Sequence, residues 1–162
     1  MEEHATLNKK EQLLKHFKGS IDWVQALSSI AEENWRLPIE PGKWSVAEVI
    51  SHLVAWDKFV LNQRIPYLFT HQEMPAAPDV EVVNEEAAIQ ARAEEKEDTI
   101  ERFCEERRHF VQVLHHFEES DFEKEILIRS KPMTLYDYLL GLAEHDNHHF
   151  TQIAKLIEIP PQ

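Results

Sequence analysis

The sequence predicts an all-α protein, a four-helix bundle formed by a single domain over residues 1–162. Four segments carry apolar residues spaced by threes and fours, a spacing that puts them on one face of a helix. Only 3 of the 162 residues are glycine, which disfavours a turn-rich β fold, and 43% are hydrophobic, enough for one core. Amphipathic helices of this length bury their apolar faces against one another.

The first predicted helix runs from about Leu7 to Asn34. Gly19–Ser20 can bend it, because glycine in a helix interior costs about 1 kcal/mol relative to alanine. Leu37–Pro38 and Pro41–Gly42 end it. Its apolar face contains Leu14, Phe17, Ile21, Val24, Leu27 and Ala31.

The second predicted helix has the clearest start in the chain. Ser45 and Glu48 have the spacing of a capping box, in which each side chain bonds the other residue's free backbone N–H. The helix fades near Leu68, before an exposed loop that contains Pro75 and Pro78. Its apolar face contains Val46, Val49, Leu53, Trp56 and Val60.

A third helix is predicted from about Glu85 to Phe117, with a highly charged stretch at 91–98. The connector 118–132 contains three apolar residues, Ile126–Ile128, too few to define a strand. The third helix's apolar face contains Ile89, Ala93, Ile100, Phe103, Phe110, Leu114 and Phe117.

The fourth predicted helix begins after Thr134, which caps it together with Asp137, and runs to about Ile157, before Pro160–Pro161. Its apolar face contains Leu135, Leu139, Leu142, Ile153 and Leu156. The order in which the four helices alternate in direction does not follow from these patterns.

Charge and composition exclude several classes of partner. The chain has 30 acidic and 17 basic residues, a formal net charge of −13, which repels nucleic acid and anionic lipid. The first residues are polar and acidic, no apolar run reaches membrane-spanning length, and the single Cys104 excludes an internal disulfide. We therefore expect a cytoplasmic protein that binds neither nucleic acid nor membrane.

Two histidines of the fourth helix are predicted to face inward. At about 100° per residue, His149 lies about 20° and His145 about 60° from the apolar Leu142. Residues one turn apart on the same face can place two imidazole nitrogens on one ion, each about 2.0–2.1 Å away. His148 falls about 120° from Leu142, on the solvent side, and is not expected to be a ligand.

A third inward histidine lies on the second helix, where His52 is about 60° from Val49 and close to Trp56. Buried imidazoles without partners are unfavourable, so a shared divalent ion, zinc or nickel, is the simplest explanation. The alternative is that each is a hydrogen-bonded core residue, as an isolated inward histidine usually is. The remaining histidines lack this geometry and are interpreted as surface or structural: His4, His16, His71, His109, His115 and His116.

Two segments resemble a known family. GKWSVAEVISHLVAWD, residues 42–57, and EHDNHHFTQI, residues 144–153, resemble the two signature segments of the DinB/YfiT-like family of metal-dependent enzymes. In that family a histidine of the second helix and an H-x-x-x-H pair of the fourth bind a divalent metal, and those positions match His52, His145 and His149. The resemblance also implies a long crossover connection, a homodimer, and relatives that transfer low-molecular-weight thiols such as bacillithiol.

Three protein ligands leave one tetrahedral position open, as in catalytic zinc sites. A thiol bound there would lose its proton and could attack an electrophile. The sequence-based hypothesis is therefore a metal-dependent transferase that joins a small thiol to an electrophilic small molecule. The alternatives are a metal-dependent hydrolase and a non-catalytic, metal-stabilised binding or resistance protein.

Asp146 directly follows His145 and falls about 40° from Leu142, on the apolar face. It is a candidate catalytic base, although a role in orienting an imidazole is favoured over that of a base. An equally plausible role is a buried carboxylate paired with a lysine, an arginine or an indole N–H.

Four further residues have both a functional and an ordinary interpretation. Gln152 could line the cleft, but we favour a polar margin. Trp56 and Phe59 could form a wall of the site, although aromatic residues at helical spacing usually belong to the core. Cys104 is interpreted as a small buried hydrophobic residue rather than a nucleophile.

Overall fold

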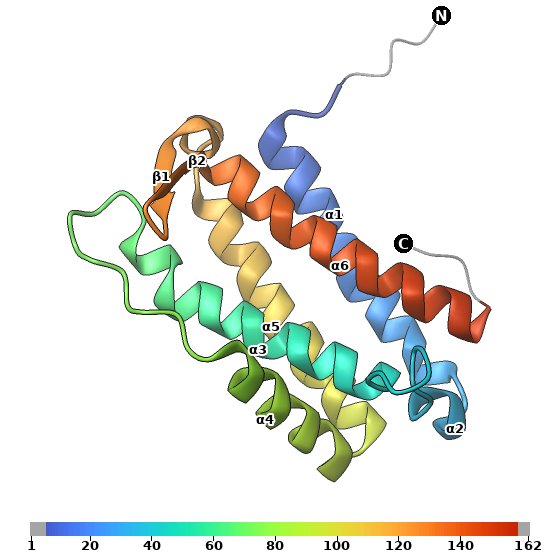
Figure 1. The fold of residues 1–162 in the computed structure, drawn as a ribbon. Coiled ribbons are helices and arrows are strands. Elements are labelled where there is room, and N and C mark those ends of the chain that lie inside the picture. The colour runs from blue at the N-terminus through green and yellow to red at the C-terminus, as the bar shows by residue number, and fades with distance from the viewer. Residues whose placement is uncertain (1–5, 159–162) are drawn as a thin grey trace, which may run out of the picture.

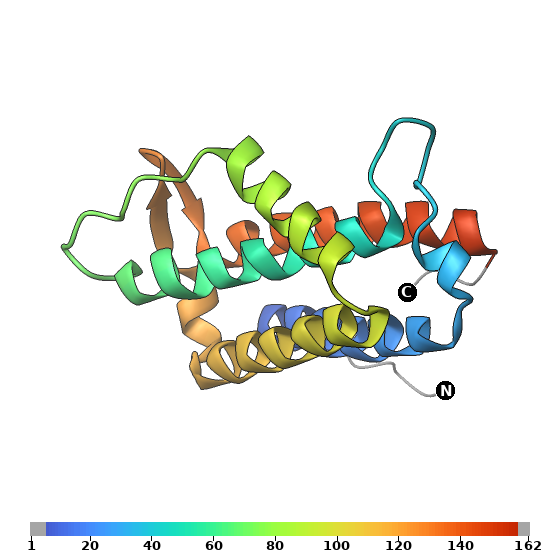
Figure 2. The same cartoon turned by 90° about the horizontal axis from the view of Figure 1, so that it is seen from below.

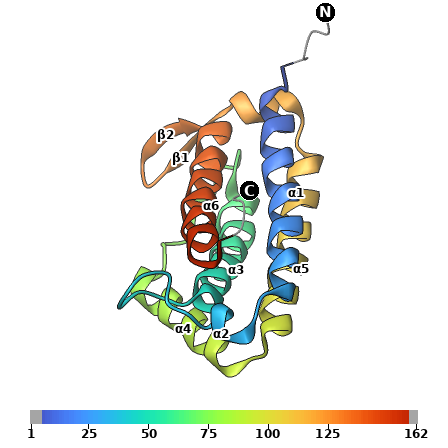
Figure 3. The ribbon, with the colours of Figure 1, turned by 90° about the vertical axis from the view of Figure 1, so that its right-hand side faces the viewer.

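The computed structural model describes residues 6–158, and four long helices form its bundle (Figure 1). They are α1 (Lys9–Ala26), α3 (Val46–Gln63), α5 (Lys96–His116) and α6 (Leu135–Ile157). Figures 2 and 3 show α1 beside α5 in one layer and α3 beside α6 in the other. The predicted all-α bundle is confirmed.

The long crossover connects α3 to α5. It consists of a 3₁₀ turn at Ile65–Tyr67, a loop, and a further helix α4 (Val80–Ala93), which packs on the outer side of α3 (Figure 2). Because α4 carries the chain back to the end where α3 began, α3 and α5 run in the same direction, while α1 and α6 run opposite to both.

Side-chain caps set four of the α-helix starts within residues 6–158, including that of α4, where Asp79 accepts from the N–H groups of Glu81 and Val82. Ser45 Oγ accepts from the Glu48 N–H at 3.2 Å and Glu48 accepts from the Ser45 N–H at 3.3 Å, so the predicted capping box is present. Thr134 accepts from the Asp137 N–H at 3.0 Å, as expected for α6. Asn8 forms a further capping box with Glu11 at the start of α1.

The first predicted helix is shorter than expected. It continues through Gly19–Ser20 but ends at Ala26, followed by a 3₁₀ turn at Leu27–Ser29 and a short helix α2 (Glu32–Trp35). The extended backbone at Ile30 redirects the chain, which brings the completely buried Trp35 into the core. The apolar spacing typical of a helix continues past Ala26, but burying the Trp35 indole outweighs it and the helix ends there.

The third predicted helix is two helices, α4 and α5, separated by Glu94 and Glu95 in extended conformation. Glu94 bonds Thr99 Oγ1 at 2.7 Å and the guanidinium of Arg102, so its carboxylate is satisfied by the first turns of α5. These bonds stabilise a chain reversal inside a charged run that otherwise looks helical.

The unassigned connector folds as a 3₁₀ turn at Glu119–Glu123 and an antiparallel hairpin of β1 (Glu125–Ile128) and β2 (Lys131–Thr134). Arg129 and Ser130 form its two-residue turn with φ of 53° and 64°. Positive φ at both positions is the type I′ geometry that tight hairpins require.

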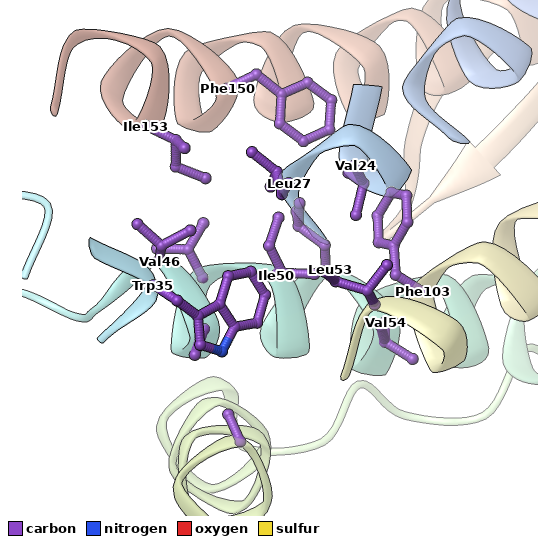
Figure 4. Close-up of a cluster of buried hydrophobic side chains, with 14 of the residues drawn as sticks. Val24, Leu27, Trp35, Val46, Ile50, Leu53, Val54, Phe103, Phe150 and Ile153 are labelled. Carbon is purple, nitrogen blue, oxygen red and sulfur yellow. The ribbon is translucent and has the colours of Figure 1, made fainter. Parts of the chain in front are cut away.

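The core consists of two clusters along the bundle. The first is shown in Figure 4, where Trp35, Ile50, Phe103 and Phe150 pack together from four different helices. The second joins Phe17, Phe110 and Leu139 to the hairpin side of the bundle. Within residues 6–158 no helix combines the length and apolarity that crossing a membrane would require.

Candidate metal centre

The structure brings His52, His145 and His149 together between α3 and α6. Their ring centroids are 4.7–5.6 Å apart, and one nitrogen from each lies within 4.8 Å of the others. His52 follows the α3 capping box by two turns, and the other two histidines are one turn apart on α6. Capped, packed helices therefore position all three imidazoles.

The spacing of the nitrogens suits a shared ion. The Nε2 atoms of His145 and His149 are 3.3 Å apart. Two ligands that lie about 2.0–2.1 Å from one ion at a tetrahedral angle are about 3.3–3.4 Å apart. The three histidines could therefore hold a metal ion.

Two hydrogen bonds determine which ring nitrogen of His52 and of His149 carries the lone pair. His52 Nδ1 bonds the backbone carbonyl of Val49, and His149 Nδ1 lies 3.0 Å from Gln152 Oε1. Since both partners are oxygens that only accept, the proton belongs on Nδ1 and the lone pair on Nε2. Each Nε2 is then free to bind a cation, the arrangement typical of histidine ligands.

The three imidazoles are neutral near pH 7. Burial lowers the pKa of His52 to about 3 and that of His149 to about 4, and the neighbouring imidazoles add to both shifts. Burial also lowers the pKa of His145. Neutral imidazole is the form that binds metal, so no proton has to be displaced.

One side of the site is open to solvent. His52 is buried and packs against the ring of Trp44 at 5.0 Å, His149 is half-buried, and His145 is exposed. His148 lies on the solvent side, as expected, with its ring 5.3 Å from that of His149. A small molecule can therefore approach the three nitrogens from the His145 side.

Asp146 is buried and paired with an arginine, one of the three roles considered from the sequence. Arg107 Nη1 donates to its Oδ2 at 2.6 Å, and His16 Nε2 lies 2.8 Å from the same oxygen. Burial by itself would raise the pKa of Asp146, but Arg107 and His16 outweigh it and hold the pKa below its usual value. The imidazole that Asp146 contacts is thus His16, which belongs to α1.

Arg107, which was not among the residues predicted from the sequence, is the centre of a buried ionic network. Its guanidinium also donates to Asp57 at 2.8 Å and to Ser20 Oγ at 3.1 Å. Burial raises the pKa of Asp57 to about 6, although Arg107 opposes the shift. Arg107 follows Phe103 by four residues and precedes Phe110 by three, so its position on the apolar face of α5 was detectable in the sequence.

The other candidate residues have mixed outcomes. Gln152 contacts the site through His149, which the favoured interpretation as a polar margin did not anticipate. Trp56 donates to Asn84 of α4 at 2.8 Å. Cys104 is buried, and burial raises its pKa, as expected for an inert thiol.

Among the histidines interpreted as surface or structural, His16 contacts Asp146 in a half-buried position, and His4 lies outside the described residues. The other four are exposed: His71, His109, His115 and His116.

The fold and the site define a helical bundle with a candidate three-histidine metal centre. Residues 21–153 match the DinB superfamily, and the chain belongs to that family. No curated protein matches the chain.

Two solved structures share the fold. YfiT from Bacillus subtilis, described as a probable metal-dependent hydrolase with an unusual four-helix bundle topology, is 16% identical with a TM-score of 0.73, over 96% of this chain and 91% of that one. A DinB-like protein from Bacillus cereus ATCC 10987 is 18% identical with a TM-score of 0.59, over 91% and 90% of the two chains.

Proposed function

We propose that this protein is a metal-dependent hydrolase of a small molecule, with His52, His145 and His149 as the metal ligands. The observation that carries the proposal is that three neutral imidazoles converge at a site open to solvent on one side. In two of them, His52 and His149, Nδ1 forms a hydrogen bond and Nε2 keeps its lone pair for a metal. The description of YfiT as a probable metal-dependent hydrolase supports it. A divalent zinc or nickel ion would supply Lewis acidity toward water and toward a substrate carbonyl.

The protein's own residues hold and orient the site. Val49 and Gln152 fix the planes of two ligand rings, and the ring of Trp44 packs against that of His52. Asp146 directs its oxygens to Arg107 and His16, so we assign it a positioning role on α6 rather than that of a base. A carboxylate whose pKa is lowered by an arginine and a histidine is a weak proton acceptor.

Thiol transfer, the activity first expected from the family resemblance, makes a different demand on the same site. It requires a low-molecular-weight thiol as second substrate, whereas hydrolysis requires only water. A non-catalytic role would leave the metal contributing stability alone.

The test is an activity screen of the full chain after chelation and reconstitution with zinc or nickel. Ester and amide substrates are offered with and without a small thiol. We expect metal-dependent hydrolysis without thiol, lost in His149→Ala together with bound metal and retained in His109→Ala, which removes an exposed histidine of α5. Turnover by metal-free protein, or turnover only when thiol is present, would contradict the proposal.

A further inference from the structure

A cavity of about 810 Å³ is lined by residues of α3, the β hairpin and α6, and its nearest walls lie about one helical turn from the ligand histidines, which do not themselves line it. Trp56 lines it four residues after His52, and Leu142 lines it three residues before His145. At about 1.5 Å of rise per residue, these walls begin roughly 5 Å along the helices from the ligand histidines. The cavity then extends toward the β hairpin.

The middle of the cavity is apolar. Phe59 of α3, Met133 of β2, and Tyr138 and Leu142 of α6 contribute to its lining. Burial raises the pKa of the Tyr138 hydroxyl, and the positive charge of Arg64 opposes that shift. A flat or aliphatic segment of a ligand matches such walls.

Arg64 is a largely buried cation at the hairpin end of the cavity. It is 5% exposed, and its Nη1 donates to the carbonyls of Gln63 and Pro75 at 2.8 and 2.9 Å. Its guanidinium carbon lies 4.5 Å from the centre of the Phe59 ring. Among residues 6–158 no carboxylate bonds to Arg64, and its Nε and Nη2 form no hydrogen bond with the protein. A buried guanidinium of this kind is stabilised by an anion, such as a carboxylate, that accepts two parallel hydrogen bonds from it.

The hairpin adds two more cations at the same end. Arg129 and Lys131 line the cavity, are exposed, and form no ion pair within the described part of the chain. Among the described residues that line the cavity there are three cations and one carboxylate, that of Asp137. This local excess of positive charge stands out in a chain whose net charge is −13.

We propose that this cavity binds the carboxylate end of an amphipathic small molecule, with Arg64 as the anion-binding residue and Arg129 and Lys131 attracting the ligand. The inference deepens the proposed function, on which it rests for the role of the histidines: the apolar part of the substrate spans the aromatic walls, and its other end reaches the metal ligands. The substrate class is therefore an acid with a hydrolysable group remote from its carboxylate.

Binding, not turnover, tests this proposal. Calorimetric titration compares 4-phenylbutyrate with its neutral amide, 4-phenylbutyramide, on the zinc-loaded protein and again after chelation. We expect the acid to bind about tenfold more tightly than the amide, because a charge-assisted bidentate bond replaces a neutral one. The preference should persist without metal and weaken with added salt.

Two variants and one control test which residues cause the preference for the acid over the amide. Arg64→Gln should bring acid and amide within about twofold of each other, and Arg129→Gln with Lys131→Gln should lower the ratio about threefold while leaving amide binding unchanged. Lys15→Gln with Lys18→Gln, which removes the same charge from exposed positions of α1, should change nothing.

Equal affinities for acid and amide would overturn the inference. So would a preference seen only with metal present, because the carboxylate would then be binding the ion. The double substitution lies at the surface of the hairpin turn, so an unchanged ratio in that variant refutes the proposal even if Arg64→Gln fails to fold. An inactive protein that still prefers the acid would contradict only the proposed hydrolysis.

Discussion

Replacing Arg107 by methionine should destabilise the protein strongly. Arg107 is 1% exposed and donates four hydrogen bonds of 2.6–3.2 Å to the carboxylates of Asp57 and Asp146. Methionine keeps most of the packing against the rings of Phe17 and Phe103, which lie 5.2 and 4.7 Å from the guanidinium carbon. The substitution therefore removes mainly the positive charge and leaves two buried acids.

The expected loss follows from the burial of the unpaired carboxylates. Removing one partner of a buried ionic network lowers the free energy of unfolding by about 3–5 kcal/mol, a large part of the roughly 5–15 kcal/mol that a domain possesses. For a chain of this size that corresponds to a decrease in Tm of about 6–20 °C. The loss should be smaller at pH 5 than at pH 7.5, because without Arg107 the folded-state pKa values of both acids rise, and the folded chain gains protons as the pH falls.

Urea unfolding of chelated protein at both pH values measures the effect. Arg92→Met is the matched control, since Arg92 is half exposed in its ion pairs with Glu48 and Glu85 and should contribute less than about 1 kcal/mol. A loss below about 1 kcal/mol in Arg107→Met, or the same loss at pH 5 and pH 7.5, would refute the electrostatic reasoning.

Three further predictions concern the site and the fold. Gln152→Ala should weaken metal binding about 10–100-fold in a competition titration, because the His149 ring loses its orienting acceptor; unchanged affinity would contradict this. Metal-free protein should lose stability on acidification from about pH 6.5 to pH 3, because the pKa of His52 is lowered to about 3 in the folded state and the unfolded chain therefore binds the proton first. The contribution of His52 to this loss is about 2 kcal/mol of unfolding free energy between pH 6.5 and 5, and it should vanish in His52→Gln. Ser45→Ala should lower the free energy of unfolding by about 1 kcal/mol through loss of the α3 cap, and urea unfolding would show no change if the cap were unimportant.

Local patterns in the sequence were sufficient for the starts of α3 and α6, but not for that of α4, which Asp79 caps and which begins five residues before the predicted start at Glu85. Ser45 and Thr134 each begin a helix where predicted, because a hydroxyl that bonds a free N–H is a short-range interaction. The breaks at Ile30 and at Glu94–Glu95 could not be predicted in the same way. They depend on the burial of Trp35 and on bonds from Glu94 to the next helix, and nothing in the local pattern forbids a continuous helix there.

The same contrast separates the histidine site from the ionic network. That His52, His145 and His149 can meet between two helices follows from helical periodicity, although His145 is exposed rather than inward, and the buried position of Asp146 follows in the same way. The partner of Asp146 does not follow from periodicity, because it depends on which helices are neighbours. The crossover through α4 makes α5 run parallel to α3 and lie against α1, which places Arg107 between Asp57 of α3 and Asp146 of α6. An inward charge can therefore be predicted from one helix, but its partner requires the order of the bundle.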